Sequence, residues 1–413
     1  MTDARVPGPA SGAPRHPARV ALVLQGFDVG GGIPATARWL RDGLHDKGDY
    51  RVDIHDLASS RSDPNSRRLL RPLSWPRRSL RRRGSNGVTY WGANGVELEP
   101  MRYRPRVELT RVLNEYDIVQ IVAGAPALAG VARHVEAPVV LLTATLVEWE
   151  RESQLSAMKG LIRLWRTFMT RLNVSTERRA LRQVEHIFVI NNHTREHLSE
   201  GGLDNVTFAP PGIDTERFTP HPEGWQSTGP LLSICRLADS RKRLDRTVRA
   251  YELLVSSVPG VPDLILAGKG KLSREVVDLI EILGLGGRIR VMSDVAVEEL
   301  PGLMREASVF LQTSQEEGLG LSVVEAMASG LPVVATSTAG SRETVEDGVT
   351  GWLVPQTTED EIAERTAGHV RILLSGTGAE MGRRGRARSV ERFSQRVAIA
   401  RVTDVYDRLG ADD

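Results

Sequence analysis

Short apolar runs alternate with amphipathic stretches along most of the chain. The runs with the length and composition of buried strands are residues 19–24, 118–122, 139–142 and 186–190. The stretches with helical spacing are residues 35–46, a long and interrupted one at 153–184, and residues 194–200. Because strands that alternate with helices form parallel sheets covered by helices, this half of the chain is predicted to be an α/β domain.

A segment rich in proline and glycine interrupts this alternation at residues 210–230. Beyond it, the strand-like runs are residues 231–235, 264–267, 289–292, 309–312 and 333–335. The helical stretches are residues 244–255, 275–283, 322–329 and then most of 359–409. The pattern therefore predicts two tandem, Rossmann-like, doubly wound domains that face a central cleft, with ligands bound at the carboxyl ends of the strands.

The expected domain boundaries follow from these changes in pattern. We expect a disordered leader, an N-terminal domain, a linker, a second domain and a C-terminal helix that packs back on the first domain, at residues 1–17, 18–215, 216–229, 230–390 and 391–413. The length of 413 residues agrees with two domains, because a domain commonly has about 150 residues. The leader lacks the apolar core of a signal peptide.

Composition narrows the class of protein. Apolar residues make up 40% of the chain and charged residues 26%, which is typical of a globular protein and excludes a mostly disordered or fibrous one. The sequence contains no run of about 18 apolar residues, so it predicts no membrane-spanning helix. The single cysteine, Cys235, excludes an internal disulfide and fits a reducing compartment. We therefore expect a cytoplasmic protein.

The net charge of +2 conceals a cluster of arginines in one stretch of the first half. Its members are Arg61, Arg67, Arg68, Arg71, Arg77, Arg78, Arg81, Arg82 and Arg83. Leucines and Trp75 are interleaved with them, which suits peripheral contact with an anionic membrane. An anionic acceptor, nucleic acid or a solvated loop are the alternatives. Residues 161–172 form a second stretch whose apolar face suits either core packing or a surface contact.

Three consecutive glycines, Gly30, Gly31 and Gly32, follow the first strand-like run and precede a helical stretch. Glycines let backbone N–H groups approach a phosphate or a sugar, and the helix N-terminus adds a positive partial charge. The alternative is a flexible turn. The spacing differs from the G-x-G-x-x-G fingerprint, which argues against a dinucleotide site.

Two cations mark the start of the second half. Arg236 ends a strand-like run, and Lys242 follows at the start of a helical stretch. Cations at the carboxyl end of a strand suit a diphosphate. A solvated basic turn is the alternative, because Arg241 and Arg243 are adjacent. Lysine occurs at only five positions in the chain, so its presence here favours a function.

Two glutamates, Glu317 and Glu325, are separated by seven residues. Glu317 lies in a glycine-rich turn, whereas Glu325 falls in a helical stretch that is otherwise small and apolar. A carboxylate on such a face needs a partner, because its burial is costly. A vicinal diol of a ribose or pyranose supplies two donors to one carboxylate. The alternatives are a helix cap for Glu317 and a salt bridge for Glu325.

The residues from about 209 to 355 resemble the C-terminal half of the retaining glycosyltransferases of family 4, which have the GT-B fold. The segments that carry the resemblance are APPGIDTERF, SICRLADSRKRLDRTVRAYELL, LILAGKG and EEGLGLSVVEAMASGLPVVATSTAGSRETVEDGVTGWLV. The resemblance implies transfer of a sugar from a nucleotide diphosphate, with retention at the anomeric carbon. It implies no cofactor or metal beyond a UDP- or GDP-sugar donor, and the sequence has no D-x-D triplet.

The resemblance also implies a role for each motif residue. Arg236 and Lys242 would hold the diphosphate and Glu317 would contact the donor sugar, so these are the expected catalytic residues. Glu325 would hold the ribose. The other expected donor-side positions are Gly31, Gly32, Lys269, Met292, Gly318, Leu319 and Gly320.

The sequence departs from the family pattern at one important place. The family commonly has a histidine in a context such as PVVxTxH, and Thr145 stands at that position here. This change is compatible with a different donor sugar, with transfer of the role to Thr145 or its neighbours, or with a catalytically silent nucleotide-sugar-binding or scaffold subunit. A GT-B phosphorylase or epimerase is a further alternative, for which Lys269 and Lys271 are the candidate cofactor lysines.

The leading hypothesis is a bacterial, cytoplasmic glycosyltransferase of the hexosyltransferase type. Its acceptor would be a hydroxyl group of a glycan, a glycolipid or a secondary metabolite, and a lipid-linked acceptor would place the enzyme at the inner face of the membrane. In this family the N-terminal domain binds the acceptor. Nucleic acid is not an expected partner.

Overall fold

The computed structural model describes residues 17–28, 32–58, 63, 66–75, 80–83, 87–149, 151 and 160–410. The chain divides into two compact units. The first consists of Met1–Ala123, Ala127–Leu141 and Phe168–Glu185, and the second of Gly124–Pro126, Leu142–Thr167 and His186–Asp413. The boundaries that we expect for the domains and the linker stay predictions.

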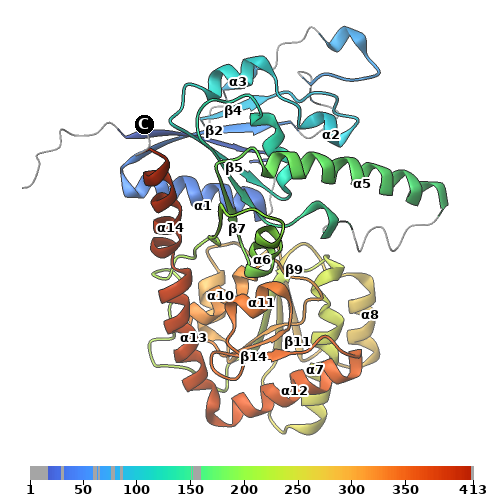
Figure 1. Cartoon of the computed structure of the whole chain (residues 1–413). Helices are drawn as coiled ribbons and strands as arrows, with labels where there is room; N and C mark the ends of the chain where they lie inside the picture. Colours follow the sequence, from blue (N-terminus) through green and yellow to red (C-terminus); the bar gives the residue numbers. More distant parts are fainter. Residues whose placement is uncertain are drawn as a thin grey trace, which may run out of the picture. The chain divides into compact units, whose positions relative to one another are not determined.

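The first sheet has the strand order β3-β4-β2-β1-β5-β6-β7-β8 (Figure 1). Its strands are β1 (Ala18–Leu24), β2 (Tyr50–Leu57), β3 (Leu80–Arg83), β4 (Val88–Trp91), β5 (Ile118–Ala123), β6 (Val139–Thr143), β7 (His186–Val189) and β8 (Val206–Phe208). β1 pairs in parallel with β2 and β5, whereas β3 is antiparallel to β4 at the edge. β1, β5 and β6 are almost entirely buried, as their apolar runs predict.

Helices accompany these strands, and two of them, at residues 99–102 and 107–113, are not expected from the pattern. The helices are α1 (Gly32–Lys47), α2 (Glu99–Arg102), α3 (Val107–Leu113), α5 (Gly160–Leu181) and α6 (Asn192–Glu200), with 3-10 turns η1 (Pro72–Ser74) and η2 (Pro126–Ala132). Leu40 and Leu44 of α1 are fully buried, which confirms the expected apolar face of this helix. α5 covers the later part of the long helical stretch, and residues 152–159 lie outside the described residues.

The second sheet has the strand order β11-β10-β9-β12-β13-β14. Its strands are β9 (Leu231–Arg236), β10 (Leu264–Lys269), β11 (Ile289–Ser293), β12 (Val309–Gln312), β13 (Val333–Thr336) and β14 (Trp352–Val354), all paired in parallel. The order reverses between β9 and β12, and ligands in doubly wound sheets bind at this point, outside the carboxyl ends of the strands. The predicted Rossmann-like topology is confirmed for this sheet.

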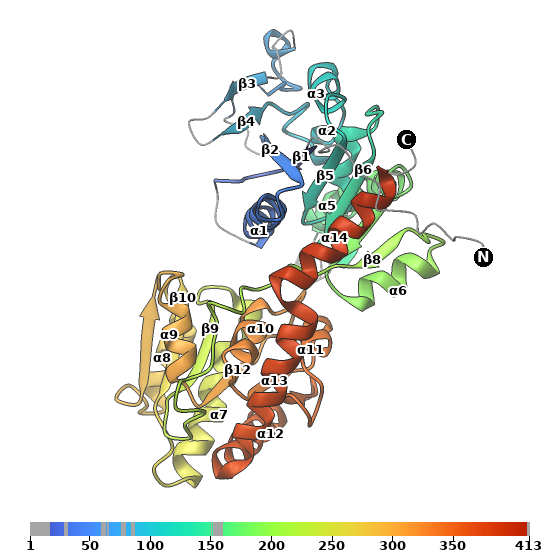
Figure 2. The same ribbon diagram turned by 90° about the vertical axis from the view of Figure 1, so that its left-hand side faces the viewer.

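Helices cover both faces of the second sheet. They are α7 (Leu244–Ser257), α8 (Arg274–Ile282), α9 (Leu300–Glu306), α10 (Leu321–Ala328), α11 (Ala339–Thr344), α12 (Glu359–Ile372), α13 (Gly378–Phe393) and α14 (Gln395–Leu409), with the short turns η3 (Ser240–Lys242) and η4 (Leu373–Thr377). α13 packs beside α10, and both lie near β12 in Figure 2.

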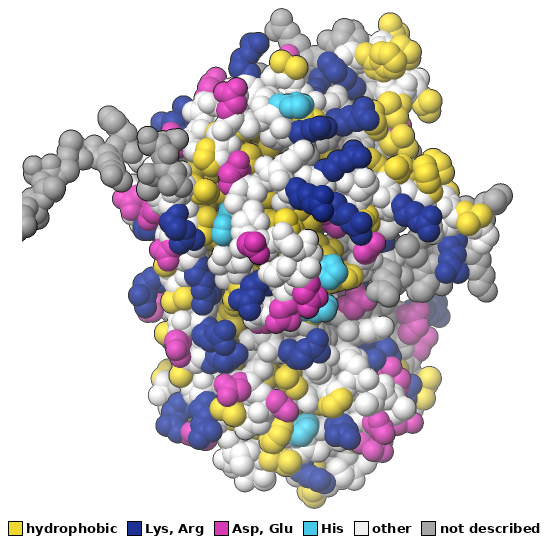
Figure 3. Space-filling view, viewed as in Figure 1, with side chains coloured by type: hydrophobic (Ala, Val, Ile, Leu, Met, Phe, Trp, Pro, Cys, Tyr) yellow, Lys and Arg dark blue, Asp and Glu magenta, His cyan; other side chains and the backbone are white. Residues whose placement is uncertain are grey.

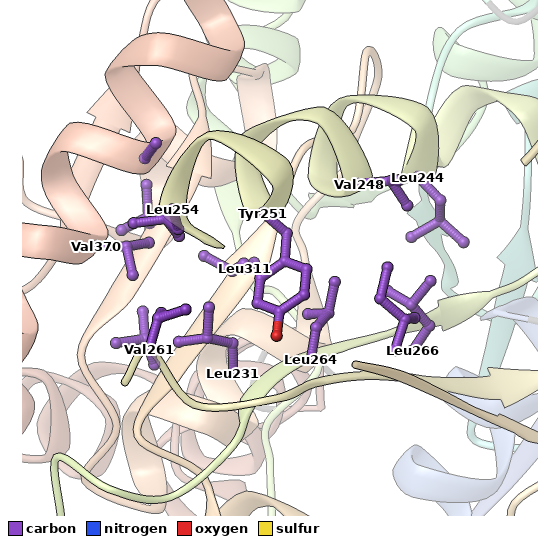
Figure 4. Close-up of a cluster of buried hydrophobic side chains, with 14 of the residues drawn as sticks. Leu231, Leu244, Val248, Tyr251, Leu254, Val261, Leu264, Leu266, Leu311 and Val370 are labelled. Atoms are coloured by element: carbon purple, nitrogen blue, oxygen red, sulfur yellow. The ribbon is translucent and has the colours of Figure 1, made fainter. Parts of the chain in front are cut away.

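The alternation of side chains along β9 divides the core into two layers. Leu231 packs with Tyr251 and Leu254 of α7 on one face (Figure 4). Leu232, the next residue, packs with the cluster that contains Phe310 and Val323 on the other face. Because both layers are apolar, the strands read as continuous hydrophobic runs, which is why the sequence pattern located them well.

Candidate functional site

The cations expected at the second sheet lie at the carboxyl edge beside the switch point. Arg236 is the last residue of β9 and Lys269 the last residue of β10, and the register of the two strands places them directly opposite each other. Gln312 ends β12 on the other side of β9. The last residues of three neighbouring strands, among them the motif residues Arg236 and Lys269, therefore lie at the edge at which a doubly wound sheet binds its ligand.

The turn after β9 holds Arg236 by a local ion pair. Asp239 accepts a hydrogen bond from the backbone N–H of Arg241 and caps η3. Its carboxylate also forms ion pairs with Arg236, at 2.7 Å, and with the side chain of Arg241, at 2.9 Å. The Arg236 side chain remains 57% exposed, so its guanidinium can reach an anion at this edge.

Lys242 and Glu317 meet directly. Lys242 Nζ donates to Glu317 Oε2 at 2.5 Å, and both side chains are largely buried. Gln312 Nε2 lies 3.4 Å from the same carboxylate oxygen. The two residues belong to separate motifs of the sequence, and the fold joins them into one charged pair beside the switch point.

The glycine-rich turn after Glu317 is fixed by its neighbours. Gly320 has a φ of +82°, a left-handed conformation that glycine adopts at little cost, and it forms the N-cap of α10. The carbonyl of Glu317 accepts from the N–H of Gly340 at 2.9 Å. A side chain on Gly340 would collide with the backbone of Leu319. Gly318, Leu319 and Gly320 are therefore held against α11.

Asn191 is a residue of this site that the sequence motifs did not indicate. Its Nδ2 donates to the carbonyl of Gly318 at 3.0 Å, while its Oδ1 caps α6 by accepting from Thr194. Next to it, Asn192 donates two hydrogen bonds of 2.7 Å to Glu343. The polar residues before the helix indicate a cap, but no local signal indicates the contact with a loop so distant in sequence.

Glu325 lies on α10 and is partly buried. Among the residues that the structure describes, none forms an ion pair or a hydrogen bond with its carboxylate. Burial raises the pKa of this carboxyl from 4.5 to about 7, and the attraction of Arg217 opposes the rise. A partly buried carboxylate to which the described residues donate no hydrogen bond is free to accept from a diol, and the ribose-binding role of Glu325 stays a prediction.

The β10–β11 edge provides the remaining donor-side positions. Met292 of β11 lies opposite Ala267, and the next pair in the register is Gly268 with Ser293. The N–H of Gly270 donates to Asp294 at 2.8 Å, which closes the turn after Lys269. Lys269 itself is exposed at the end of β10.

The first unit contains the glycine-rich loop. Gly32 is exposed at the start of α1, and Gly31 lies outside the described residues. Asp56, at the buried end of β2, accepts hydrogen bonds from the N–H groups of Gly26 at 2.7 Å and Phe27 at 3.1 Å. This carboxylate, which sequence reasoning did not select, therefore anchors the beginning of the loop.

Thr145, at the position of the family histidine, follows β6. Its N–H donates to the carbonyl of Gly124 at 3.0 Å, and its hydroxyl has no partner within the described part of the chain. Nearby in sequence, the Trp149 ring stacks on the His193 ring of α6 at 4.7 Å. Within the described residues, no hydrogen bond or ion pair joins Thr145 to Lys242 or Glu317, so its role stays a prediction.

The described ranges contain no group of three or more His, Cys, Asp or Glu side chains arranged to hold a metal ion. They also contain no helix that is long and apolar enough to span a membrane.

Two family models match the chain in succession. The model "Glycosyltransferase Family 4" matches residues 30–217, and "Glycosyl transferases group 1" matches residues 220–370. Together they take in both halves of the chain, including the N-terminal half in which the motif resemblance is weak.

Curated relatives are similar to part of the chain. A GDP-mannose-dependent alpha-(1-6)-phosphatidylinositol monomannoside mannosyltransferase of Mycolicibacterium smegmatis is 29% identical over 55% of this chain and 64% of its own. A D-inositol 3-phosphate glycosyltransferase of Saccharomonospora viridis is 29% identical over 51% of each chain. The chain thus spans about half to two thirds of the length of these relatives.

Solved structures match over nearly the full length. Sucrose-phosphate synthase from Thermosynechococcus elongatus has a TM-score of 0.70 at 19% identity, over 96% of this chain and 100% of its own. Anabaena HepE in complex with UDP and glucose has a TM-score of 0.67 at 16% identity, over 95% and 100%. These likenesses show the GT-B fold. The two family models, which match the chain in succession, show that it belongs to family 4 of the glycosyltransferases.

Proposed function

We propose that this chain transfers a sugar from a nucleotide diphosphate to a hydroxyl acceptor, with retention at the anomeric carbon and without a metal ion. The observation that supports this proposal best is the Lys242–Glu317 pair at the switch point of the second sheet. Arg236 lies at the same edge, and no described residue pairs with the carboxylate of Glu325. In this proposal the two cations bind the diphosphate, Glu317 contacts the sugar and Glu325 binds the ribose.

The chemistry needs positive charge where the diphosphate departs. Sugar transfer builds positive charge at the anomeric carbon while negative charge grows on the leaving phosphate. Arg236 and Lys242 supply cations to this phosphate, and the N-terminus of α10 adds the partial charge of its free N–H groups. These groups are fixed before the reaction, so they need little rearrangement as the charge develops.

Glu317 would act on the sugar side. Its Oε2 is occupied by Lys242 and Gln312, and no described residue bonds to Oε1. That second oxygen is suited to a hydroxyl group of the donor sugar. The ion pair also orients the Lys242 ammonium, so loss of either partner would disturb both the sugar and the phosphate.

The donor is proposed to be a UDP- or GDP-sugar. One curated relative is named as GDP-mannose-dependent, and one matching structure contains UDP and glucose. Recognition of the ribose by Glu325 is common to both nucleotides. The acceptor is proposed to be a hydroxyl group on a lipid-linked molecule, because the mycobacterial relative is named for a phosphatidylinositol mannoside.

Contact with an anionic membrane at the inner face fits such an acceptor. Leu70, before η1, and Leu73, within it, are 86% and 91% exposed, and Arg67 and Arg71 are close to them in sequence. Exposed apolar side chains among arginines are typical of interfacial segments. Arg61, Arg77 and Arg78 lie outside the described residues, and the side chains of Arg81, Arg82 and Arg83 are not described.

The test is release of nucleotide diphosphate from UDP-, GDP- and dTDP-sugars by the purified protein in the presence of cell extract. Lys242→Ala and Glu317→Ala should each lower the rate about a hundredfold, the usual cost of removing one preorganised charged group. Arg274→Ala is the control, because the side chain of this arginine of α8 is 91% exposed and its ion pair, at 3.9 Å, is with Asp278 of the same helix. Release that both active-site variants leave unchanged would refute the site.

A comparison of donor binding with diphosphate release distinguishes a transferase from a catalytically silent subunit. If the protein binds nucleotide sugars but releases no diphosphate in any combination, it would be a nucleotide-sugar-binding or scaffold subunit.

Sedimentation with phosphatidylglycerol vesicles tests the membrane contact. If Arg67→Ala/Arg71→Ala leaves this sedimentation unchanged at low salt, the proposed membrane contact through this segment is wrong.

A further inference from the structure

The first unit contains a cavity of about 1000 Å³ that none of the donor-site residues lines. Its walls come from the segment around α2 and α3, from the residues that follow η2, and from the later part of α5. Asn114 and Glu136 line it and lie just before β5 and β6. The cavity is therefore at the amino ends of these strands, the edge opposite to that at which such sheets bind nucleotides.

The walls of this cavity are cationic. Arg104, Arg111, Arg133 and Arg179 line it, and Glu136 is the one acidic residue among the lining residues. Within the described ranges, none of these four guanidinium groups has an ion pair or a hydrogen bond. Several unpaired cations around one hollow raise its positive potential and favour an anionic occupant.

The α5 wall of the cavity continues as an exposed apolar stripe. Leu164, Phe168 and Leu172 recur at every fourth position, so they share one face of the helix. Leu164 is 68% exposed and Leu172 is 40% exposed. Leu172 itself lines the cavity, and Arg179, two turns further along the same face, lines it as well.

Figure 3 shows the same change of character along the surface. Lys and Arg side chains gather over the area where α3 and the later part of α5 lie, and hydrophobic side chains are exposed toward the beginning of α5. The long axis of one helix thus joins an apolar surface to a cationic hollow. A ligand that follows this surface must be an amphiphile with an anionic head.

We propose that the cavity binds the headgroup of an anionic phospholipid, while the first half of α5 lies in the interfacial region of the membrane. Arginine is suited to the phosphate, because its guanidinium can form two parallel hydrogen bonds with phosphate oxygens. Trp165 is 56% exposed on this half of α5, and tryptophan is enriched at membrane interfaces. The inference does not depend on transferase activity, because no donor-site residue takes part.

The first experiment compares two arginine pairs in binding to vesicles of phosphatidylglycerol and phosphatidylcholine. Arg111→Ala/Arg179→Ala removes two cations from the cavity, and Arg51→Ala/Arg178→Ala removes two exposed arginines that do not line it. We expect the first pair to lower the partition coefficient about fivefold per arginine relative to the second pair. Equal binding by the two pairs at low salt would overturn the proposal.

Thermal unfolding followed by circular dichroism checks that both double variants fold. Arg133→Glu, in an exposed turn that lines the cavity, is a second variant for the vesicle-binding experiment. We expect it to weaken vesicle binding at least as much as the alanine pair does, because it reverses a charge.

The second experiment separates a lipid from a soluble phosphate. Glycerol phosphate, which carries the headgroup without the tails, should bind far more weakly than dihexanoyl phosphatidylglycerol. Leu164→Ser should weaken binding of the vesicles but leave binding of glycerol phosphate unchanged. Equal affinity for the two small ligands, or no effect of Leu164→Ser on the vesicles, would show that the site recognises a soluble phosphate and would overturn the proposal.

Discussion

Glu325 has a carboxyl group with which no residue in the described part of the chain pairs. Its pKa is raised to about 7 by burial, compared with 4.5 for the ordinary carboxyl. The folded state therefore keeps a proton that the unfolded chain releases between these two values. The free energy of unfolding should fall as the pH rises from about 4.5 to about 7, and the loss should persist above that range.

Glu325→Gln removes this titration. The variant should gain stability over the natural protein as the pH rises, with an additional difference of up to about 3 kcal/mol between pH 4.5 and pH 8. Urea unfolding at several pH values measures it. A difference that stays constant with pH would mean that the carboxyl of Glu325 is solvated in the folded state.

Gly268 has a conformation and a neighbour that exclude any side chain. Its φ is +138°, and a Cβ at this position would overlap the carbonyl oxygen of Cys235 on β9. Gly268→Ala should therefore cost roughly 3–5 kcal/mol, since the strand ends that carry Arg236 and Lys269 must separate.

Gly270 is the matched control for Gly268. It also has a positive φ, of +84°, but its nearest neighbour would be the Ala238 side chain at 3.9 Å. Gly270→Ala should cost only the conformational strain, about 1–2 kcal/mol. Thermal unfolding of both variants checks the difference, and equal losses would show that packing against Cys235 is unimportant.

At the scale of elements, Asn191 at the start of α6 has two structural roles. Asn191 caps this helix with its oxygen and holds the Gly318 carbonyl with its nitrogen. Asn191→Ala should lower stability by about 1–2 kcal/mol. It should also raise the KM for the nucleotide sugar severalfold, because the turn beside Glu317 loses its support.

Thr358→Ala separates the two effects of Asn191. Thr358 caps α12 by accepting from the N–H of Glu361, and no motif residue of the candidate site contacts it. Its loss should lower stability by about 1 kcal/mol without changing the KM for the donor. If both variants change only stability, Asn191 is a cap and nothing more.

The hydrophobic pattern of the sequence locates some helices and strands better than others, and the reason is physical. α7 and the strands of the second sheet are amphipathic or wholly apolar, so their positions follow from hydrophobicity alone. β2 was missed because its sequence, YRVDIHDL, contains charged residues. The structure buries two of these polar groups in specific contacts: His55 bonds to Trp91 and Tyr116, and Asp56 bonds to the loop after β1.

The residues of the candidate site also form two groups, those that sequence motifs indicate and those that they do not. Arg236, Lys242, Glu317 and Glu325 could be selected because each lies in a motif with a recognisable spacing. Asn191 and Asp56 could not, because their contacts are made with backbone groups that only the folded chain brings near. A hydrogen bond to a carbonyl leaves no signature in the composition of either segment.

At the scale of the whole molecule, the nucleotide site and the cavity of the first unit should respond to different ligands. Addition of UDP or GDP should slow amide hydrogen exchange around residues 236–242 and 317–325. It should leave the segment at residues 97–114, beside the cavity, unchanged, whereas dihexanoyl phosphatidylglycerol should do the reverse. Hydrogen exchange with mass spectrometry measures both. Protection of both regions by one ligand would show that the two sites are not independent.

The single cysteine gives this chain a built-in reporter. Cys235 immediately precedes Arg236, and burial raises the pKa of its thiol to about 12. The thiolate is the reactive form, so alkylating reagents should modify the folded protein only when β9 opens locally. The rate of labelling would then report how often the sheet edge that carries Arg236 and Lys269 opens. A nucleotide that occupies that edge should slow the labelling without any label having to be engineered into the chain.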